Sequence, residues 1–216
     1  MLAEARVVRY PEGALIFSKG DPGNSMMAVL HGRVMISNFA TDGRQIIVTT
    51  FREGEVFGEM ALLDGRERSA DVTAAAECEL LVVPRRSFLR LLERRPEVSL
   101  ELMAVLCGRL RRTNEQVEDF AFLGLESRIA KLLLRLAHDE MRQPTASRLG
   151  VKISQRVLGE LIGGSREGVN KQLQEWKRAG IITIEKGSIV IRDREALMDF
   201  VQPMKLRAPS ARSIHR

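Results

Sequence analysis

The segment FGEMALLDGRERSADV, residues 57–72, combines residue types that suit a sugar and a phosphate. Glu59 offers two acceptor oxygens for a pair of hydroxyl groups, and Arg68 with Ser69 supplies a bidentate cation and a hydroxyl donor for a phosphate. Glycines at positions 58 and 65 let the backbone turn closely around a ligand. An acid and an arginine nine residues apart on one short loop therefore predict a cradle for a nucleotide monophosphate. The alternative is a surface turn in which Glu59 and Arg68 form an ordinary salt bridge.

A second segment, residues 154–182, has the residue types of a helix that reads DNA. Ser154 and Ser165 are suitable helix N-caps, and Gly163 provides a turn between two helices. On the second helix, the side chains predicted to be buried are Val169, Leu173 and Trp176. Those predicted to point outward are Arg166, Glu167, Asn170, Lys171 and Gln174. Arginine suits guanine and glutamate accepts from cytosine, so this face could read a major groove; the alternative is a solvated face.

Short strands separated by glycines must position the first segment. Glycines recur at positions 13, 20, 23, 32, 43, 54, 58 and 65. Short apolar runs lie between them, including 14–17, 26–30, 34–36 and 46–51, and the run 78–83 closes the region. Regular turn signals between short strands predict an antiparallel sandwich or barrel.

A long helix is predicted from about Pro96 onward. Apolar or small side chains follow spacings of 4, 4, 3, 4 and 3 at Leu102, Leu106, Leu110, Thr113, Val117 and Phe120. These spacings place the side chains on one narrow stripe, which can pack against a copy of itself. We therefore predict a dimerisation helix with a coiled-coil-like seam, and hence a homodimer.

Gly124 ends the stripe, and the elements after it are expected in the order of a winged helix-turn-helix. A helix over 127–138 precedes the two short helices around Gly163, and the run IITIEKGSIVI then predicts two strands about a turn at Lys186. We expect four parts: a sensor domain over 1–95, the dimerisation helix and hinge over 96–124, a DNA-binding domain over 125–201 and a disordered basic tail over 202–216.

The charge distribution separates the same two halves. The 216 residues carry a net charge of +6, but residues 1–124 hold 16 basic and 18 acidic residues, whereas residues 125–216 hold 18 and 10. A mildly acidic part followed by a strongly basic one is typical of a sensory module joined to a module that binds a polyanion. A basic face that only confers solubility is the alternative.

Composition argues against several other classes. Two cysteines, Cys78 and Cys107, and three scattered histidines do not suit a disulfide framework or most metal sites. No segment has the apolar length of a transmembrane helix, and the first residues lack the apolar region of a signal peptide. We expect a cytoplasmic protein with no membrane partner and no metal.

The motif GExAL followed by RSA resembles the phosphate-binding cassette of cyclic-nucleotide-binding domains, and its placement resembles the cyclic AMP receptor protein and FNR family of bacterial regulators. The resemblance runs from about Tyr10 to Leu197. It implies an α+β fold with an N-terminal antiparallel β-roll, which is a double-stranded β-helix, then a long dimerisation helix and a C-terminal winged helix-turn-helix. The position of Glu59 then binds the ribose 2′-hydroxyl. The positions of Arg68 and Ser69 then bind the cyclic phosphate, and backbone groups of Gly58 and Ala70 support it. Met60 is expected in the same ligand site.

The resemblance also extends to the stretch RLRRTNEQ on the long helix. It implies that Thr113 reaches the nucleotide base and that Asn114, which replaces a serine of the family, reaches the base bound in the partner subunit. Serine at position 69 favours cAMP as the allosteric ligand, and cGMP stays open. Members that sense oxygen need cysteine ligands that the chain lacks, and haem-binding members need an axial histidine, for which the sensor half offers His31 alone.

In the DNA-binding half, GxSRExV resembles the family's recognition-helix signature. It implies that Arg166 and Glu167 read G·C pairs of a TGTGA-like half-site in a palindromic operator, with Lys171 replacing a third base-contacting arginine. Expected phosphate contacts are Ser154, Gln155, Ser165 and Lys186. The loop over 139–149 is expected to touch RNA polymerase.

Two rivals to this cyclic-nucleotide-responsive, non-enzymatic regulator stay open. One is a cupin-type barrel enzyme, which would need clustered histidine and carboxylate ligands on its strands. The other is a regulator of the same fold that acts without ligand and uses Glu59 and Arg68 as an internal salt bridge.

Overall fold

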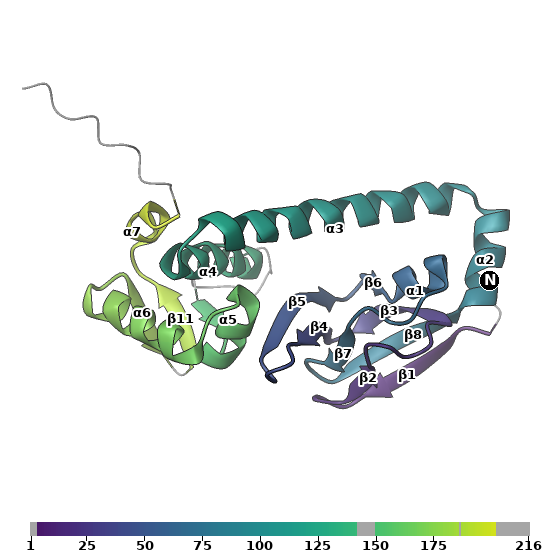
Figure 1. The fold of residues 1–216 in the computed structure, drawn as a ribbon, viewed down its shortest axis with the longest axis horizontal. Helices are drawn as coiled ribbons and strands as arrows, with labels where there is room; N and C mark the ends of the chain where they lie inside the picture. Colours follow the sequence, from purple (N-terminus) through teal and green to yellow (C-terminus); the bar gives the residue numbers. More distant parts are fainter. Residues whose placement is uncertain (1–3, 142–149, 186, 202–216) are drawn as a thin grey trace, which may run out of the picture. The chain divides into compact units, whose positions relative to one another are not determined.

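The computed structural model describes residues 4–141, 150–185 and 187–201, and it divides the chain into two compact units, Met1–Glu115 and Gln116–Arg216. The boundary between the units falls within the long helix, before Gly124. Figure 1 shows the first unit as a β-roll with short helices, and the second as a helical unit with a small sheet. None of the described helices is long and apolar enough to cross a membrane.

Two four-stranded antiparallel sheets form the β-roll, in the orders β1-β8-β3-β6 and β2-β7-β4-β5. Their strands are β1 (Arg6–Tyr10), β2 (Leu15–Phe17), β3 (Ser25–His31), β4 (Arg33–Phe39), β5 (Gln45–Arg52), β6 (Val56–Phe57), β7 (Asp71–Ala74) and β8 (Cys78–Pro84). Alternating side chains of both sheets face inward, and those fully enclosed include Val29, Val34, Phe57 and Leu80. The predicted antiparallel β architecture is therefore confirmed.

Strand β1 was not expected, because the sequence predicted the first strand only at residues 14–17. Five residues of β1 pair with β8, from Arg6 opposite Val82 to Tyr10 opposite Cys78. The strand has only five residues, and its arginines, Arg6 and Arg9, lie on opposite faces of the sheet. It therefore lacks the regular alternation of apolar and polar residues by which half-buried strands are recognised.

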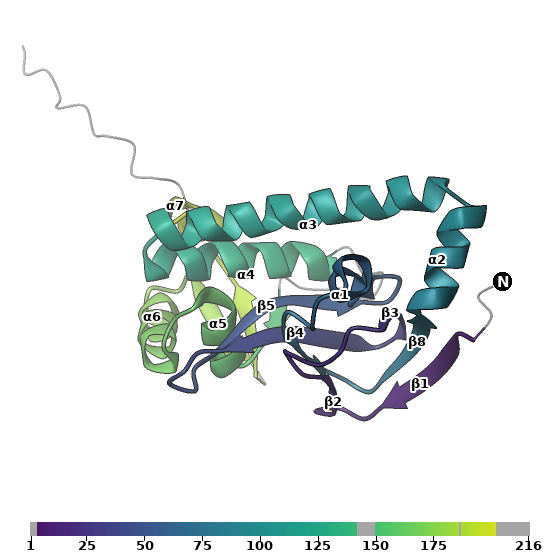
Figure 2. The ribbon, with the colours of Figure 1, turned by 45° about the vertical axis from the view of Figure 1, so that its right-hand side comes forward.

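Three helices belong wholly or partly to the first unit: α1 (Glu59–Asp64), α2 (Arg85–Arg94) and α3 (Glu97–Phe122). Figures 1 and 2 both show α2 connecting the end of β8 to the start of α3. The inner face of α2 packs through Phe88 on a small core with Met26, Leu62 and Val83, and Leu102 of α3 joins it. The long helix is confirmed, and none of its 26 residues is buried.

The second unit contains α4 (Leu125–Met141), α5 (Gln155–Ile162), α6 (Arg166–Arg178) and α7 (Arg194–Asp199). Its sheet has the order β10-β11-β9, formed by β9 (Gly150–Lys152), β10 (Ile182–Glu185) and β11 (Ser188–Ile191). One apolar core joins these elements, with Ile129, Leu158, Leu173 and Trp176 among its enclosed side chains. The winged helix-turn-helix order is confirmed, and the tail over 202–216 lies outside the described residues.

Candidate functional site

The predicted cradle begins at Gly58, which precedes a short helix rather than forming part of an extended loop. Gly58 has φ 77° and is the N-cap of α1, whose six residues start with Glu59. A Cβ at Gly58 would lie 2.6 Å from Nη1 of Arg68. Both the left-handed backbone and this close approach require glycine here. The expectation that Glu59 and Arg68 lie on one short loop is corrected, because Glu59 begins the six-residue helix α1 and Arg68 follows the end of that helix.

Arg68 is buried and fixed by main-chain acceptors. Its side chain donates from Nη1 to the carbonyl of Gly58 at 2.8 Å and from Nη2 to the carbonyl of Ser25 at 2.8 Å. The guanidinium lies 4.2 Å from the centroid of the Phe17 ring. Its Nε is buried and has no hydrogen-bond partner within residues 4–141, 150–185 and 187–201. Burial lowers the pKa of Arg68, because desolvation penalises the cation, while Asp21 and Glu59 act in the opposite direction.

Glu59 is only 3% exposed, and it pairs with an arginine that was not predicted from the sequence as a site residue. Nη1 of Arg109, on α3, donates to Oε1 of Glu59 at 2.6 Å, and Nη2 donates to the carbonyl of Val56. The Arg109 guanidinium also lies 4.4 Å from the centroid of the Phe51 ring. The second oxygen of Glu59, Oε2, is buried and has no hydrogen-bond partner in the part of the chain that the structure describes. One acceptor of the cradle is thus already taken, and the other is free.

The pairing of Glu59 with Arg109 overturns the internal Glu59–Arg68 salt bridge considered from the sequence. Both side chains of that supposed bridge are buried, and within the described residues each is bonded to other groups. Arg109 could have been suspected from the sequence, since it is a charged residue next to the apolar stripe and one helical turn before Thr113.

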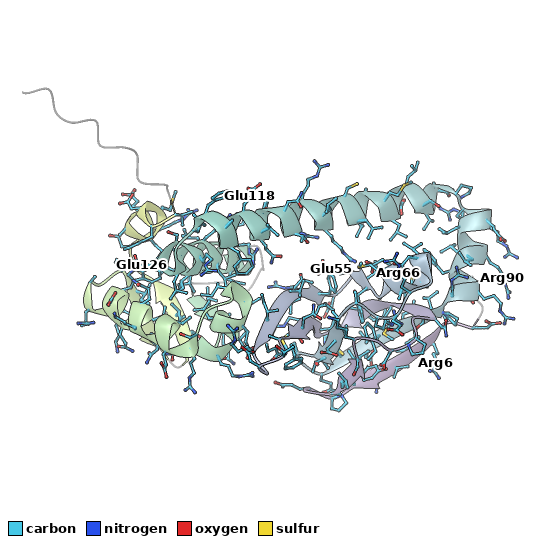
Figure 3. The ribbon with its side chains drawn as sticks, in the orientation of Figure 1. Arg6, Glu55, Arg66, Arg90, Glu118 and Glu126 are labelled. Carbon is cyan, nitrogen blue, oxygen red and sulfur yellow. The ribbon has the colours of Figure 1, made fainter. Side chains whose placement is uncertain are left out.

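The remaining cradle residues differ in exposure. Ala70 is buried, whereas Ser69 is exposed and its Oγ donates to Sδ of Met60 at 3.8 Å. Thr113 and Asn114 are exposed on α3, and their side chains make no hydrogen bond within the described residues. Figure 3 shows Arg66, just beyond the end of α1, on the side of the roll that α3 passes. The structure therefore brings Gly58, Glu59, Arg68 and their neighbours together, but leaves Thr113 and Asn114 open.

Helix α6 carries the predicted reading face. Ser165 is its N-cap, with Oγ accepting from the backbone N–H of Gly168 at 3.0 Å. Val169, Leu173 and Trp176 are buried as expected, and so is Gln172. The exposed side chains are Arg166, Glu167, Asn170, Lys171, Gln174, Lys177 and Arg178. Such a row of basic and amide side chains has the chemistry to contact base edges and phosphates.

Three of the four predicted phosphate contacts, Ser154, Gln155 and Ser165, lie at helix starts. Ser154 caps α5 and its Oγ accepts from Val157 N–H at 3.2 Å, which leaves the hydroxyl proton free for another acceptor. Gln155 is half-buried in the first turn. Lys186 lies outside the described residues. The cap of α5 at its other end is Gly163, whose φ of 62° forms the turn into α6.

The described part of the chain offers little support for a haem site or a metal site. His31 is exposed and its Nδ1 lies 2.8 Å from Oε1 of Glu53. Among the described residues, no group of three or more histidine, cysteine or acidic side chains could hold a metal ion.

Two families match the two halves of the chain. Residues 7–95 match the family described as "Cyclic nucleotide-binding domain", and residues 127–200 match the family described as "Crp-like helix-turn-helix domain". A "CRP-like cAMP-activated global transcriptional regulator" of Mycobacterium tuberculosis is 34% identical over 191 residues, which are 88% of this chain and 85% of that protein. The "cAMP-activated global transcriptional regulator CRP" of Escherichia coli O157:H7 is 29% identical over 193 residues, with 88% and 91% covered.

Solved structures agree in fold. The c-di-GMP responsive global regulator CLP of Xanthomonas campestris has a TM-score of 0.77 at 26% identity, covering 88% of this chain and 95% of that one. A transcriptional regulator of the CRP/FNR family from Thermus thermophilus has a TM-score of 0.75 at 27% identity, covering 91% and 98%.

Proposed function

We propose, from the premise that this chain belongs to the CRP/FNR family of transcription regulators, that it binds cAMP in the cradle and an operator through α6. A regulator of this family binds DNA and is not built as an enzyme. One observation carries the ligand half. Arg68 is buried, and within the described residues its guanidinium donates to carbonyl oxygens and to the Ser25 hydroxyl rather than to a carboxylate. Asp21 and Glu59 act on Arg68 through their charges alone, so its positive charge has no hydrogen-bonded counter-charge among those residues. A cyclic phosphate has the single negative charge that balances it.

The free atoms of the cradle suit a cyclic nucleotide. The unpartnered Oε2 of Glu59 accepts from the ribose 2′-hydroxyl, while Arg68 and the exposed hydroxyl of Ser69 hold the cyclic phosphate. Gly58 and Ala70 offer small residues where the backbone approaches the ligand. Arg109 links Glu59 to α3 and so transmits the state of the cradle to the helix.

Adenine is the favoured base, with cGMP as the competing ligand. Thr113 and Asn114 follow Arg109 by about one helical turn, and their side chains are exposed. Thr113 contacts the base in its own subunit, and Asn114 contacts the base in the partner subunit. Several relatives, including those from M. tuberculosis and E. coli, are named cAMP-activated, which supports cAMP for this chain.

The proposed assembly is a homodimer through α3. Apolar side chains along this helix stay open in the single chain, with Leu110 62% and Val117 60% exposed, and Phe120 is 40% exposed. Burying such a stripe against its copy removes it from water and brings Asn114 to the second cradle.

DNA binding is assigned to α6 and the helix starts beside it. Arg166 and Glu167 read G·C pairs of a TGTGA-like half-site, Lys171 adds a third base contact, and Ser154, Gln155, Ser165 and Lys186 contact phosphates. In the dimer, the two copies of α6 would lie about one DNA turn apart, roughly 34 Å, on a palindromic operator. Cyclic nucleotide shifts the protein toward that arrangement only by its differential affinity for the two states.

Two further assignments concern RNA polymerase and the location of the protein in the cell. Residues 139–149, proposed to contact RNA polymerase, have side chains outside the described part of the chain. A DNA-bound regulator of this kind acts in the cytoplasm.

Calorimetric titration of the full chain with cAMP and with cGMP tests the ligand half. The proposal predicts binding of cAMP at submillimolar concentration or tighter, with weaker binding of cGMP. Absence of binding by both nucleotides, together with tight operator binding, would instead support a regulator of the same fold that acts without ligand.

A further inference from the structure

Met60 is the most exposed methionine whose side chain the structure describes. Its exposed fraction is 54%, compared with 51% for Met103 and 40% for Met198, whereas Met26 and Met27 are 6% exposed. It lies in the first turn of α1, directly after Glu59. A thioether this accessible to solvent is open to oxidation to the sulfoxide.

The sulfur of Met60 is the hydrogen-bond partner of a proposed phosphate ligand. Oγ of Ser69 donates to Sδ of Met60 at 3.8 Å, and within the described residues this is the hydrogen bond that the Ser69 side chain makes. A thioether is a weak acceptor, so the Ser69 hydroxyl readily donates its hydrogen bond to a phosphate oxygen instead. In the reduced protein the contact thus holds Ser69 close to the cradle without competing strongly for it.

We propose that Met60 is a reversible oxidation site for peroxides, and that its sulfoxide weakens cyclic-nucleotide binding by retaining the hydroxyl of Ser69. This inference rests on the proposed function, because that function assigns Ser69 to the phosphate. The peroxide transfers one oxygen atom to the sulfur. The S–O bond forms and the O–O bond breaks, the sulfur is oxidised by two electrons, and the peroxide is reduced to water or an alcohol.

Methionine sulfoxide at position 60 competes more strongly than the thioether for the hydrogen bond that the Ser69 hydroxyl donates. The sulfoxide oxygen is a much stronger acceptor than the thioether, and it is attached to the atom that Ser69 already contacts. A nucleotide must then break a good hydrogen bond before Ser69 can donate to the phosphate. Methionine sulfoxide reductases restore the thioether, so the effect is reversible.

The experiment compares cAMP binding by calorimetry before and after hydrogen peroxide, in the full chain and in Met60→Leu, Ser69→Ala and Met198→Leu. A dithiol treatment after oxidation restores cysteines such as the exposed Cys107 and leaves the sulfoxide in place. Mass spectrometry of peptides reports the oxygen gained at Met60. Met198→Leu is the matched control, because Met198 is exposed but lies on α7.

The expected loss of affinity on oxidation is about tenfold in the wild type and in Met198→Leu, the order expected for one hydrogen bond to a charged group. Met60→Leu should bind equally before and after peroxide. Ser69→Ala should bind weakly at the start and lose nothing more, because the competing hydroxyl is absent.

Equal binding by the reduced and oxidised wild type, with oxygen present at Met60, would overturn the inference and leave the proposed function intact. A further tenfold loss in oxidised Ser69→Ala would overturn it too, since the effect would not pass through the hydroxyl. Failure of the reduced wild type to bind cAMP would instead refute the proposed function and this inference with it.

Discussion

Replacing Glu59 by glutamine isolates the contact proposed for the ribose. The substitution keeps the size of the side chain and removes its charge. Its Oε1 pairs with Arg109, but Arg109 keeps the carbonyl of Val56 and the face of Phe51, so the guanidinium retains partners. The buried Oε2, which has no hydrogen-bond partner among the described residues, is the atom assigned to the 2′-hydroxyl.

The size of the effect follows from the burial of this carboxylate. Glu59 is 3% exposed, so water does not compensate for a lost ligand contact. A hydrogen bond to a charged group contributes about 1.5–3 kcal/mol, which corresponds to about a 10-fold to 150-fold weaker affinity for cAMP. The same loss is expected when the wild type binds 2′-deoxy-cAMP instead of cAMP.

Calorimetry of both proteins with both nucleotides closes a thermodynamic cycle. Glu59→Gln should bind cAMP and 2′-deoxy-cAMP with nearly equal affinity, because the residue that distinguishes them has lost its charge. Glu53→Gln is the control, since Glu53 is an acid on the exposed side of the roll that pairs with His31. A Glu59→Gln protein that keeps the full wild-type preference for the ribose would refute the assignment.

Three further predictions concern the other parts of the molecule. Arg166→Ala should cost about 1–3 kcal/mol on a specific operator in fluorescence anisotropy and relax selectivity at one base pair, whereas an equal loss on random DNA would make it a phosphate contact. Gly163→Ala should lower the free energy of unfolding by about 1–3 kcal/mol in denaturant melts, because φ is 62° and the new Cβ would lie 2.9 Å from the Phe120 ring; an unchanged midpoint would contradict the strain. Leu110→Lys should shift sedimentation toward the monomer, while a dimer of unchanged stability would place the interface elsewhere.

The sequence identified the cradle by residue type but not its geometry. Glu59 and Arg68 were recognisable because an acid and an arginine near glycines suit a nucleotide. The helix that begins at Glu59, α1, was not recognisable, since six residues are too few for a helical period to emerge. Arg109 was missed for a different reason, because its partner Glu59 is 50 positions away and no local pattern links them.

Helix α2 and strand β1 were not predicted from the sequence, for separate reasons. Helix α2 does carry an apolar set at helical spacing, Phe88, Leu91 and Leu92, but five arginines over 85–95 hide it from a reading based on composition. Strand β1 becomes stable only through its pairing with β8, which lies about seventy residues onward. Tertiary pairing of that kind overrides weak local preference.

The central claim is that cyclic nucleotide in the cradle and DNA on α6 are thermodynamically coupled. The most direct measurement is the affinity of the full chain for a palindromic TGTGA-like operator, by fluorescence anisotropy at one salt concentration, with and without saturating cAMP. The account predicts that cAMP tightens operator binding by about 5-fold to 150-fold, and that operator DNA tightens cAMP binding by the same factor. An operator affinity that is equal with and without cAMP, in a protein that binds cAMP, would contradict it.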